Sequence, residues 1–289
     1  MQKLENEKIL VEIEEKGAEV TRIYDKKKNR EVLWDGNPKF WKRHSPILFP
    51  NVGKTWGNII RVDNAEYPAP QHGFARDSVF TCTQSELVSA AYLLKSSEDT
   101  KKVYPFDFAL YVRYRLEKNK LNVLWKVQNS GEKPMYFTIG GHPAFWCAKE
   151  GRRNDCLLKF PGKESVEYLG VDLQTGAARP ETRQSLELEN GCVRISDELF
   201  DLDTMIFDGG QIEEAWVCEK DGTPFAGVEC KGFPNFGIWS VKDAPFVCLE
   251  PWAGRCDNVG FEEDISRKPG INRVEAGESF QKEYSILVG

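Results

Sequence analysis

Apolar and polar residues alternate with a period of two through the middle of the chain. The pattern is clearest in residues 108–137, where every second position is apolar in two runs separated by a polar segment at 117–120. The alternating positions are Leu110, Val112, Tyr114, Leu116, Leu121, Val123, Trp125 and Val127. Because successive side chains of a strand point to opposite faces, this pattern predicts two antiparallel strands joined by a hairpin. A second turn at 129–132 then leads into an apolar segment at 135–139.

Short segments of the same kind recur along the rest of the chain, separated by Gly, Asn, Asp and Pro. Helical periodicity is scarce. Only residues 197–200 and 264–266 suggest short helical turns, and the 15 prolines oppose long helices. The expected class is therefore all-β, either a large antiparallel sandwich or a barrel. The further predicted strands are residues 10–14, 19–24, 216–218, 225–230, 236–240, 245–249 and 284–288.

No low-complexity linker or exact repeat divides the 289 residues, so we expect a single domain over residues 1–289. Apolar residues make up 40% and charged residues 29%, the balance of a globular chain. The formal net charge of −6 argues against a basic nucleic-acid binder. No apolar stretch approaches the roughly 18 residues of a membrane span. The first residues alternate in charge without the apolar core of a signal peptide, so a cytoplasmic location is expected.

The cysteines do not have the spacing of a metal site. No two of the eight are separated by two residues, and closely spaced histidines are missing as well. We therefore expect reduced, mostly buried thiols and no metal. The eight are Cys82, Cys147, Cys156, Cys192, Cys218, Cys230, Cys248 and Cys256.

Three histidines are candidates for acid–base chemistry, against 8 Trp, 9 Tyr and 17 Phe. His142 follows a predicted strand in the run Gly-Gly-His-Pro, which holds an imidazole in a fixed geometry on a bent backbone. His72 lies in a polar turn before Gly73, a residue that lets the backbone approach a ligand closely. It is either a ligand contact or a loop histidine bonded to backbone. His44 has no neighbour that calls for catalysis, so His142 is the strongest candidate.

One carboxylate has a comparable setting. Glu250 follows the apolar run at 245–249 and precedes a proline. A glutamate at the end of a buried strand is partly desolvated, which raises its pKa toward that of a working base. The alternative is an ion pair with Arg255 or Arg43, and the residues alone leave both interpretations open.

Four segments in order resemble the signatures of the aldose 1-epimerase (galactose mutarotase) superfamily, with the bacterial LacX-like proteins as the nearest branch. They are residues 41–53 (Trp-Lys-Arg-His-Ser-Pro-Ile-Leu-Phe-Pro-Asn-Val-Gly), 71–76 (Gln-His-Gly-Phe-Ala-Arg), 141–145 (Gly-His-Pro-Ala-Phe) and 248–252 (Cys-Leu-Glu-Pro-Trp). The resemblance implies an antiparallel β-supersandwich that interconverts the α and β anomers of a free sugar. It implies no cofactor, because nothing is oxidised or transferred.

The resemblance also implies roles for individual residues. Glu250 corresponds to the base and His142 to the acid of the proton transfers, while His72 holds or polarises the sugar. An aspartate that binds ring hydroxyls corresponds to Asp203, with Asp201 and Asp208 as close alternatives. Because aromatic faces pack against the apolar face of a sugar, three rings are candidates for the pocket. These are Trp252, Trp146 and Phe74.

Two departures from the family pattern affect the expected substrate. Lys54 follows Gly53 where many mutarotases have an arginine, and Lys is a point charge rather than a fork. The histidine motif reads Gly-Gly-His-Pro-Ala-Phe-Trp instead of Asn-His-Thr-Tyr-Phe-Asn, which argues against galactose itself. A related branch acts on hexose 6-phosphates and shares His-Gly-Phe-Ala-Arg. Arg43, Lys54 and Arg76 would suit a phosphate, but Arg76 would equally suit an ion pair with Asp77. We expect an unphosphorylated sugar.

Two other classes of protein fit parts of the pattern. A sugar-binding protein without turnover would show the same hydroxyl contacts and stacking rings. A glycoside hydrolase needs two carboxylates flanking the bond, whereas these motifs pair a carboxylate with a histidine. Hydrolysis therefore ranks last.

Overall fold

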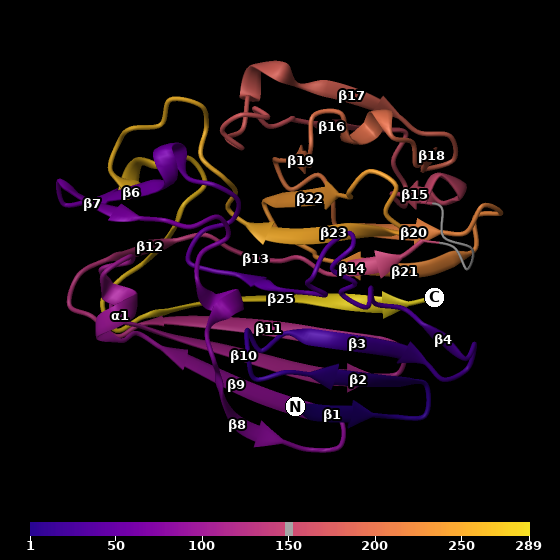
Figure 1. The fold of residues 1–289 in the computed structure, drawn as a ribbon, viewed down its shortest axis with the longest axis horizontal. Helices are drawn as coiled ribbons and strands as arrows, with labels where there is room; N and C mark the ends of the chain where they lie inside the picture. Colours follow the sequence, from indigo (N-terminus) through magenta and orange to yellow (C-terminus); the bar gives the residue numbers. More distant parts are fainter. Residues whose placement is uncertain (148–152) are drawn as a thin grey trace.

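Antiparallel β-sheets make up the computed structural model, which describes residues 1–147 and 153–289 (Figure 1). The largest sheet has nine strands and joins the hairpin near the middle of the chain to the C-terminal strand. Its order is β18 (Cys192–Arg194), β15 (Leu157–Lys159), β20 (Glu214–Cys218), β21 (Pro224–Glu229), β25 (Ser279–Val288), β11 (Lys120–Asn129), β10 (Phe108–Glu117), β9 (Ser89–Lys95) and β8 (Thr81–Ser85). The all-β class predicted from the alternation is confirmed.

The predicted hairpin is present as β10 and β11. The two strands pair in register from Phe108 opposite Asn129 to Glu117 opposite Lys120. From Leu110 to Glu117, buried and exposed residues alternate along β10, and the buried ones are the predicted apolar positions. One face of this strand therefore lies on the core. This is the outcome that the period of two requires.

The second large sheet contains the strands that position the candidate site. Its order is β19 (Met205–Phe207), β22 (Asn235–Trp239), β23 (Phe246–Ala253), β13 (Ile139–Gly141) and β5 (Ile47–Leu48), with β14 (Ala144–Trp146) also paired to β23. The predicted strand at 245–249 is longer than expected. Glu250 therefore lies inside β23 rather than at its end.

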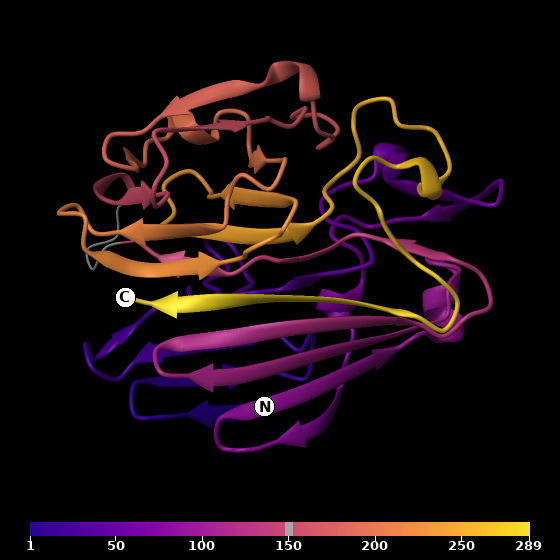
Figure 2. The same cartoon turned by 180° about the vertical axis from the view of Figure 1, so that it is seen from behind.

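A third sheet of four strands covers one face of the nine-stranded sheet. It contains β1 (Gln2–Glu5), β2 (Ile9–Ile13), β3 (Val20–Asp25) and β4 (Arg30–Glu31). Figure 1 shows it in front of β9, β10 and β11, and Figure 2, from behind, shows it beyond them. One large cluster of buried side chains fills the space between the sheets, including Val11, Val112 and Leu249.

The remaining elements are short. Three strand pairs are β12 (Met135–Phe137) with β24 (Asn272–Val274), β16 (Ser165–Tyr168) with β17 (Gln184–Glu187), and β6 (Ile59–Val62) with β7 (Ala65–Pro68). The helical segments are α1 (Glu98–Lys101) and the 3-10 turns η1 (Trp56–Asn58), η2 (Ala75–Asp77), η3 (Arg153–Asp155), η4 (Pro180–Thr182), η5 (Glu198–Phe200) and η6 (Ile265–Arg267). The turns predicted near 197–200 and 264–266 are thus confirmed as η5 and η6. No helix in the described residues is long and apolar enough to cross a membrane.

Candidate active site

Strand β23 has two faces with different surroundings. Val247, Leu249 and Ala253 point into the main core, whereas Glu250 and Trp252 point the opposite way and line a cavity. The period of two places them side by side on that face. A carboxyl group and an indole thus stand together on one strand.

The neighbouring strand brings a histidine to the same place. His142 directly follows β13, and its backbone N–H donates to the carbonyl of Pro46 (3.1 Å). The two glycines before it are needed for close packing. A Cβ on Gly140 would lie 2.4 Å from Cδ1 of Trp252, and one on Gly141 would lie 2.7 Å from Oη of Tyr284. These glycines let β13 approach its neighbours and fix the direction of the imidazole.

His142 and Glu250 meet inside the molecule. Nε2 of His142 lies 3.3 Å from Oε2 of Glu250, and the side chains are 8% and 1% exposed. Both carboxyl oxygens of Glu250 and Nδ1 of His142 lack a hydrogen-bond partner in the described part of the chain. Such buried polar groups without partners are rare and suggest a ligand or a catalytic role.

Burial shifts the pKa values of this pair in opposite directions. It raises the pKa of Glu250 well above its ordinary value; the indole of Trp252 opposes the shift and the charge of Asp203 adds to it. Burial also lowers the pKa of His142 to about 3, with help from the charges of Arg76 and Arg43. Both shifts have the same cause, because desolvation disfavours the charged form of each group.

The alternative interpretation of Glu250 as an ion-pair partner of an arginine is wrong. Arg255 donates to the carbonyl of Cys256 and to Asn258 instead. Arg43 donates to both carboxylate oxygens of Asp77, at 3.1 and 3.2 Å. Glu250 thus keeps His142 as its ionisable neighbour.

His72 lies beside this pair and also bonds to backbone. The backbone N–H of His72 donates to the carbonyl of Gly53 (2.8 Å), and the ring Nδ1 of His72 accepts the backbone N–H of Gly53 (3.1 Å). An accepting Nδ1 places the ring proton on Nε2. The ring centroid is 5.5 Å from that of His142, and burial lowers the pKa of His72 well below its ordinary value. The interpretation as a loop histidine bonded to backbone is confirmed, and the ring also lines the cavity, where its Nε2 lies 3.3 Å from the side-chain amide nitrogen of Gln71. A contact with a ligand stays a prediction.

The cavity has a volume of about 340 Å³ and a wall of mixed polarity. All five residues predicted to bind the substrate and both proposed proton carriers lie on this wall. The predicted residues on the wall are Lys54, His72, Arg76, His142, Asp203, Glu250 and Trp252. The fold thus brings these seven residues together, although about two hundred residues of the chain separate Lys54 from Trp252.

The charged residues of the wall differ in how they are held. Nη2 of Arg76 donates to the carbonyl of Gln71 (2.6 Å), and its Nε lies 3.8 Å from Asp77. Burial lowers the pKa of Arg76 to about 10. Lys54 has no ion-pair partner among the residues that the structure describes. Arg43 is absent from the wall, so of the three cations considered for a phosphate, Lys54 and Arg76 face the cavity.

The structure distinguishes the three candidate aspartates. Asp203 lines the cavity, and its φ is positive, at 63°. Asp208 is bound by Arg183 in a two-bond ion pair at 2.9 and 3.0 Å. Asp201 is exposed and lies outside the wall. Asp203 is therefore the aspartate available to a ligand.

Two indoles on the wall were not predicted. Trp41 stacks on His142, with ring centroids 4.8 Å apart and 27° between the planes. Trp239 meets the same imidazole edge-on at 5.6 Å. By contrast, two of the three rings proposed from the sequence lie elsewhere: Trp146 packs on Trp34 at 4.7 Å, and Phe74 packs on the main core. A tryptophan in an apolar run looks the same whether it fills a core or a cavity wall.

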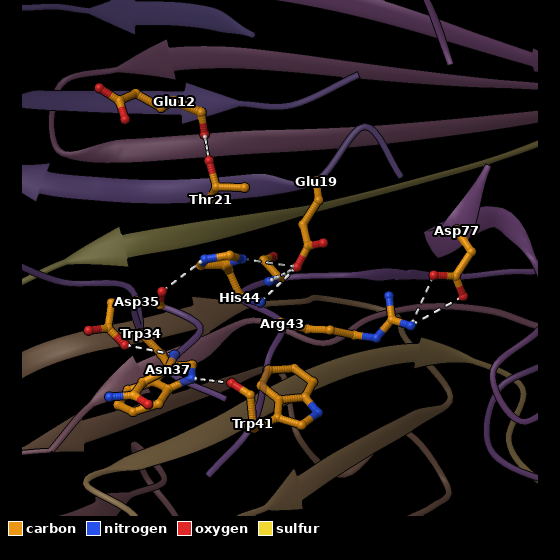
Figure 3. Close-up of polar contacts among 11 residues, drawn as sticks. Glu12, Glu19, Thr21, Trp34, Asp35, Asn37, Trp41, Arg43, His44 and Asp77 are labelled. Atoms are coloured by element: carbon orange, nitrogen blue, oxygen red, sulfur yellow. Dashed lines mark hydrogen bonds and ion pairs between the residues drawn. The ribbon is translucent and has the colours of Figure 1, made fainter. Parts of the chain in front are cut away.

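The segment that carries Trp41 is anchored to the four-stranded sheet. The buried carboxylate of Glu19 accepts the backbone N–H groups of His44 (2.7 Å) and Ser45 (2.9 Å) and lies 3.6 Å from the His44 ring. Trp34 donates its indole N–H to the carbonyl of Trp41 (2.8 Å). Figure 3 shows these contacts, together with the pairing of Arg43 to Asp77. His44, left without a role by the sequence, thus holds the loop that positions Trp41.

One set of side chains near the cavity has the donor types of a metal site. Donor atoms of His142, Cys248 and Glu250 all lie within 4.8 Å of one another, and all three residues are buried. No disulfide joins the cysteines. Such a set was not predicted from the sequence, because His142 lies about a hundred residues before Cys248 and only the fold brings it close.

Comparison with known proteins identifies the family. Residues 1–215 match the family model described as aldose 1-epimerase. The chain belongs to the aldose 1-epimerase family, and this membership supports an isomerase-type enzyme that acts on a sugar. The resemblance drawn from the four motifs is thus confirmed.

Individual relatives match over nearly the whole chain. The plasmid-encoded protein LacX of Lactococcus lactis subsp. lactis is 29% identical, covering 99% of this chain and 98% of its own. A galactose mutarotase related enzyme from Lactobacillus acidophilus superposes with a TM-score of 0.92 at 30% identity, covering 99% and 96% of the two chains. A galactose mutarotase-like protein from Lactobacillus casei ATCC 334 gives 0.91 at 29% identity, with both chains fully covered.

Proposed function

We propose that this protein is an aldose 1-epimerase that interconverts the α and β anomers of a free hexose through Glu250 and His142. The observation that carries the proposal is the 3.3 Å separation of Nε2 of His142 and Oε2 of Glu250 on the wall of a cavity. Ring opening needs a base for the C1 hydroxyl proton and an acid for the ring oxygen. A carboxyl group and an imidazole side by side supply both.

The resting position of the proton on this pair follows from burial. The raised pKa of Glu250 and the lowered pKa of His142 both favour the neutral pair. Glu250 acts as base only after the proton passes to His142, so sugar hydroxyls that donate to the carboxylate favour the working form. The stacked indole of Trp41 favours it too, because an aromatic face attracts a cation.

The reaction then proceeds by two proton transfers in each direction. Glu250 removes the C1 hydroxyl proton while His142 protonates the ring oxygen, which opens the ring to the aldehyde. After rotation about the C1–C2 bond, the C5 hydroxyl closes on the other face, and the two residues exchange roles. Each positioned proton transfer contributes roughly 10²- to 10⁴-fold.

The other wall residues would hold the sugar during this cycle. The Nε2–H of His72 donates to a hydroxyl or the ring oxygen, and the carboxylate of Asp203 accepts from hydroxyls. The indole of Trp252 offers a flat apolar face, which suits the apolar face of a pyranose. The ammonium group of Lys54 donates to sugar oxygens as a point charge.

A hexose 6-phosphate is the second candidate substrate. The observation that favours it is the presence of two cations, Lys54 and Arg76, on the wall of the same cavity. Against it, Arg43 is neutralised by Asp77, and Arg76 shares that carboxylate. The free hexose therefore ranks first.

The test measures anomer exchange by NMR exchange spectroscopy or polarimetry on freshly dissolved glucose, galactose and glucose 6-phosphate. We expect acceleration with at least one unphosphorylated hexose and a lower rate with glucose 6-phosphate. A faster reaction with the phosphate would reverse the order of the two substrates. Binding of a sugar without acceleration would make the chain a sugar-binding protein and overturn the proposal.

A further inference from the structure

Cys248 is a buried thiol next to the proposed proton carriers that their reaction does not use. It precedes Glu250 by two residues on β23, so both side chains are on the same face. It does not line the cavity. It packs instead with Trp34, Ala144 and Phe246 behind the cavity wall.

The donor atoms of this thiol and its two neighbours have the separation of a zinc site. They lie within 4.8 Å of one another, and the nitrogen–oxygen pair of His142 and Glu250 is 3.3 Å apart. Zinc bonds to imidazole nitrogen, thiolate sulfur and carboxylate oxygen are about 2.0 to 2.3 Å long, which puts ligands of a tetrahedral ion roughly 3.3 to 3.8 Å apart. The nitrogen–oxygen pair is already at that distance, and the sulfur lies at most 4.8 Å from both.

The carboxyl group has unused bonding capacity at this place. Both oxygens of Glu250 lack a hydrogen-bond partner among the described residues, although the residue is 1% exposed. A cation bound here would satisfy these lone pairs. The charges also balance, since a neutral imidazole, a thiolate and a carboxylate carry −2 against the +2 of the ion, and a buried charge must be compensated.

We propose that His142, Cys248 and Glu250 form an inhibitory site for Zn²⁺, with the fourth coordination position open to the cavity. Binding releases two protons to solvent, one from the thiol and one from the pair of Glu250 and His142. The ion occupies both proton carriers and competes with the sugar. The inhibitory part rests on the proposed epimerase function, whereas binding of the ion does not.

A spectroscopic experiment tests the site without any sugar. Co²⁺ is added to the full-length protein as a probe, and absorption is recorded. We expect a thiolate-to-cobalt charge-transfer band in the near ultraviolet, its loss in Cys248→Ala, and its displacement by Zn²⁺. Cys256→Ala is the matched control, because Cys256 lines the cavity but lies outside the cluster. A band that survives in Cys248→Ala and disappears in Cys256→Ala would overturn the proposed ligand set, as would the absence of any band.

Activity provides the second readout. We expect Zn²⁺ to inhibit anomer exchange reversibly, with recovery on adding EDTA. Loss of a group that only orients a metal ligand weakens metal affinity roughly 10- to 100-fold. Loss of the ligand itself should weaken inhibition by zinc at least as much. Cys248→Ala and Cys248→Ser should show this loss while keeping the turnover without zinc. Equal inhibition of these variants and the wild type would contradict the proposal. If no anomer exchange is detected at all, the proposed function fails while the cobalt band still decides the site.

Discussion

The indole of Trp41 stacks on the imidazole of His142, with ring centroids 4.8 Å apart. In the proposed mechanism, this contact offsets part of the cost of charging a buried histidine. Burial lowers the pKa of His142 to about 3, yet ring opening requires a protonated imidazole. An aromatic face attracts a cation by about 1 to 2 kcal/mol when water is excluded. We therefore propose Trp41 as a positioning residue that favours the protonated imidazole.

Replacing Trp41 by leucine removes that attraction. We expect kcat to fall by roughly 5- to 30-fold, the equivalent of the cation–π energy, with a smaller loss in Trp41→Phe, which keeps a ring. Steady-state kinetics with the preferred sugar measures kcat and KM of each variant. An unchanged kcat with a raised KM would show instead that Trp41 contacts the sugar.

Gly140 and Gly237 allow the indole of Trp252 to lie flat against the neighbouring strands. A Cβ on either glycine would come within 2.4 Å of that ring. Gly140→Ala therefore forces the ring or the strand to move. We expect destabilisation by about 1 to 3 kcal/mol and a raised KM, measured by chemical denaturation and kinetics. Gly131→Ala is the control, because its nearest neighbour is 3.4 Å away. Equal effects of the two substitutions would contradict this explanation.

Asp203 and Asp208 form a matched pair for testing hydroxyl recognition. Asp203 faces the cavity, whereas Asp208 pairs with Arg183 outside it. A hydrogen bond to a charged group contributes about 1.5 to 3 kcal/mol, so Asp203→Asn should raise KM by roughly 10- to 100-fold. Asp208→Asn should leave KM unchanged. A normal KM in Asp203→Asn would remove that residue from the binding site.

Stability should depend on pH through His44. Burial lowers the pKa of this histidine, but the hydrogen bond and charge of Glu19, the carbonyl of Asp35 and the charge of Glu14 outweigh it, so the net pKa is raised. Protonation thus favours the folded state. This contribution is fully present below the unfolded pKa of about 6.5 and is lost as pH rises through the folded value.

The variant His44→Gln tests this linkage. Urea denaturation of both proteins at several pH values gives the difference in unfolding free energy. We expect the wild type to have its largest advantage near pH 6 and a smaller one near pH 9. A difference that does not change with pH would show that His44 stabilises the loop without its charge.

The sequence predicts strands well where one face of the strand is buried. β10 and β11 were found because their apolar positions alternate without interruption. The first half of β25 was missed, since residues 279–283 are largely exposed and polar. They form a strand because they pair with β11, for example Gln281 opposite Lys126. Such pairing is a tertiary effect that local pattern does not encode. The single-domain organisation stays a prediction.

Candidate site residues can be picked out from the sequence where they have an unusual local setting, and their roles stay predictions. His142 follows two glycines, and Glu250 interrupts an apolar strand, so both were identifiable. Trp41 and Trp239 lie in apolar runs like those of core residues, and only the fold brings them onto His142. The sequence likewise does not show that Cys248 lies near His142, because about a hundred residues separate them and only the fold brings them close.

Anomer exchange in Glu250→Gln, measured by NMR exchange spectroscopy beside the wild type, tests the central claim most directly. Glutamine keeps the size of the side chain but can neither accept nor share the proton. We predict a loss of roughly 10²- to 10⁴-fold with unchanged thermal unfolding, and a similar loss in His142→Asn. Exchange at the wild-type rate in Glu250→Gln would contradict the assignment of this pair as the proton carriers.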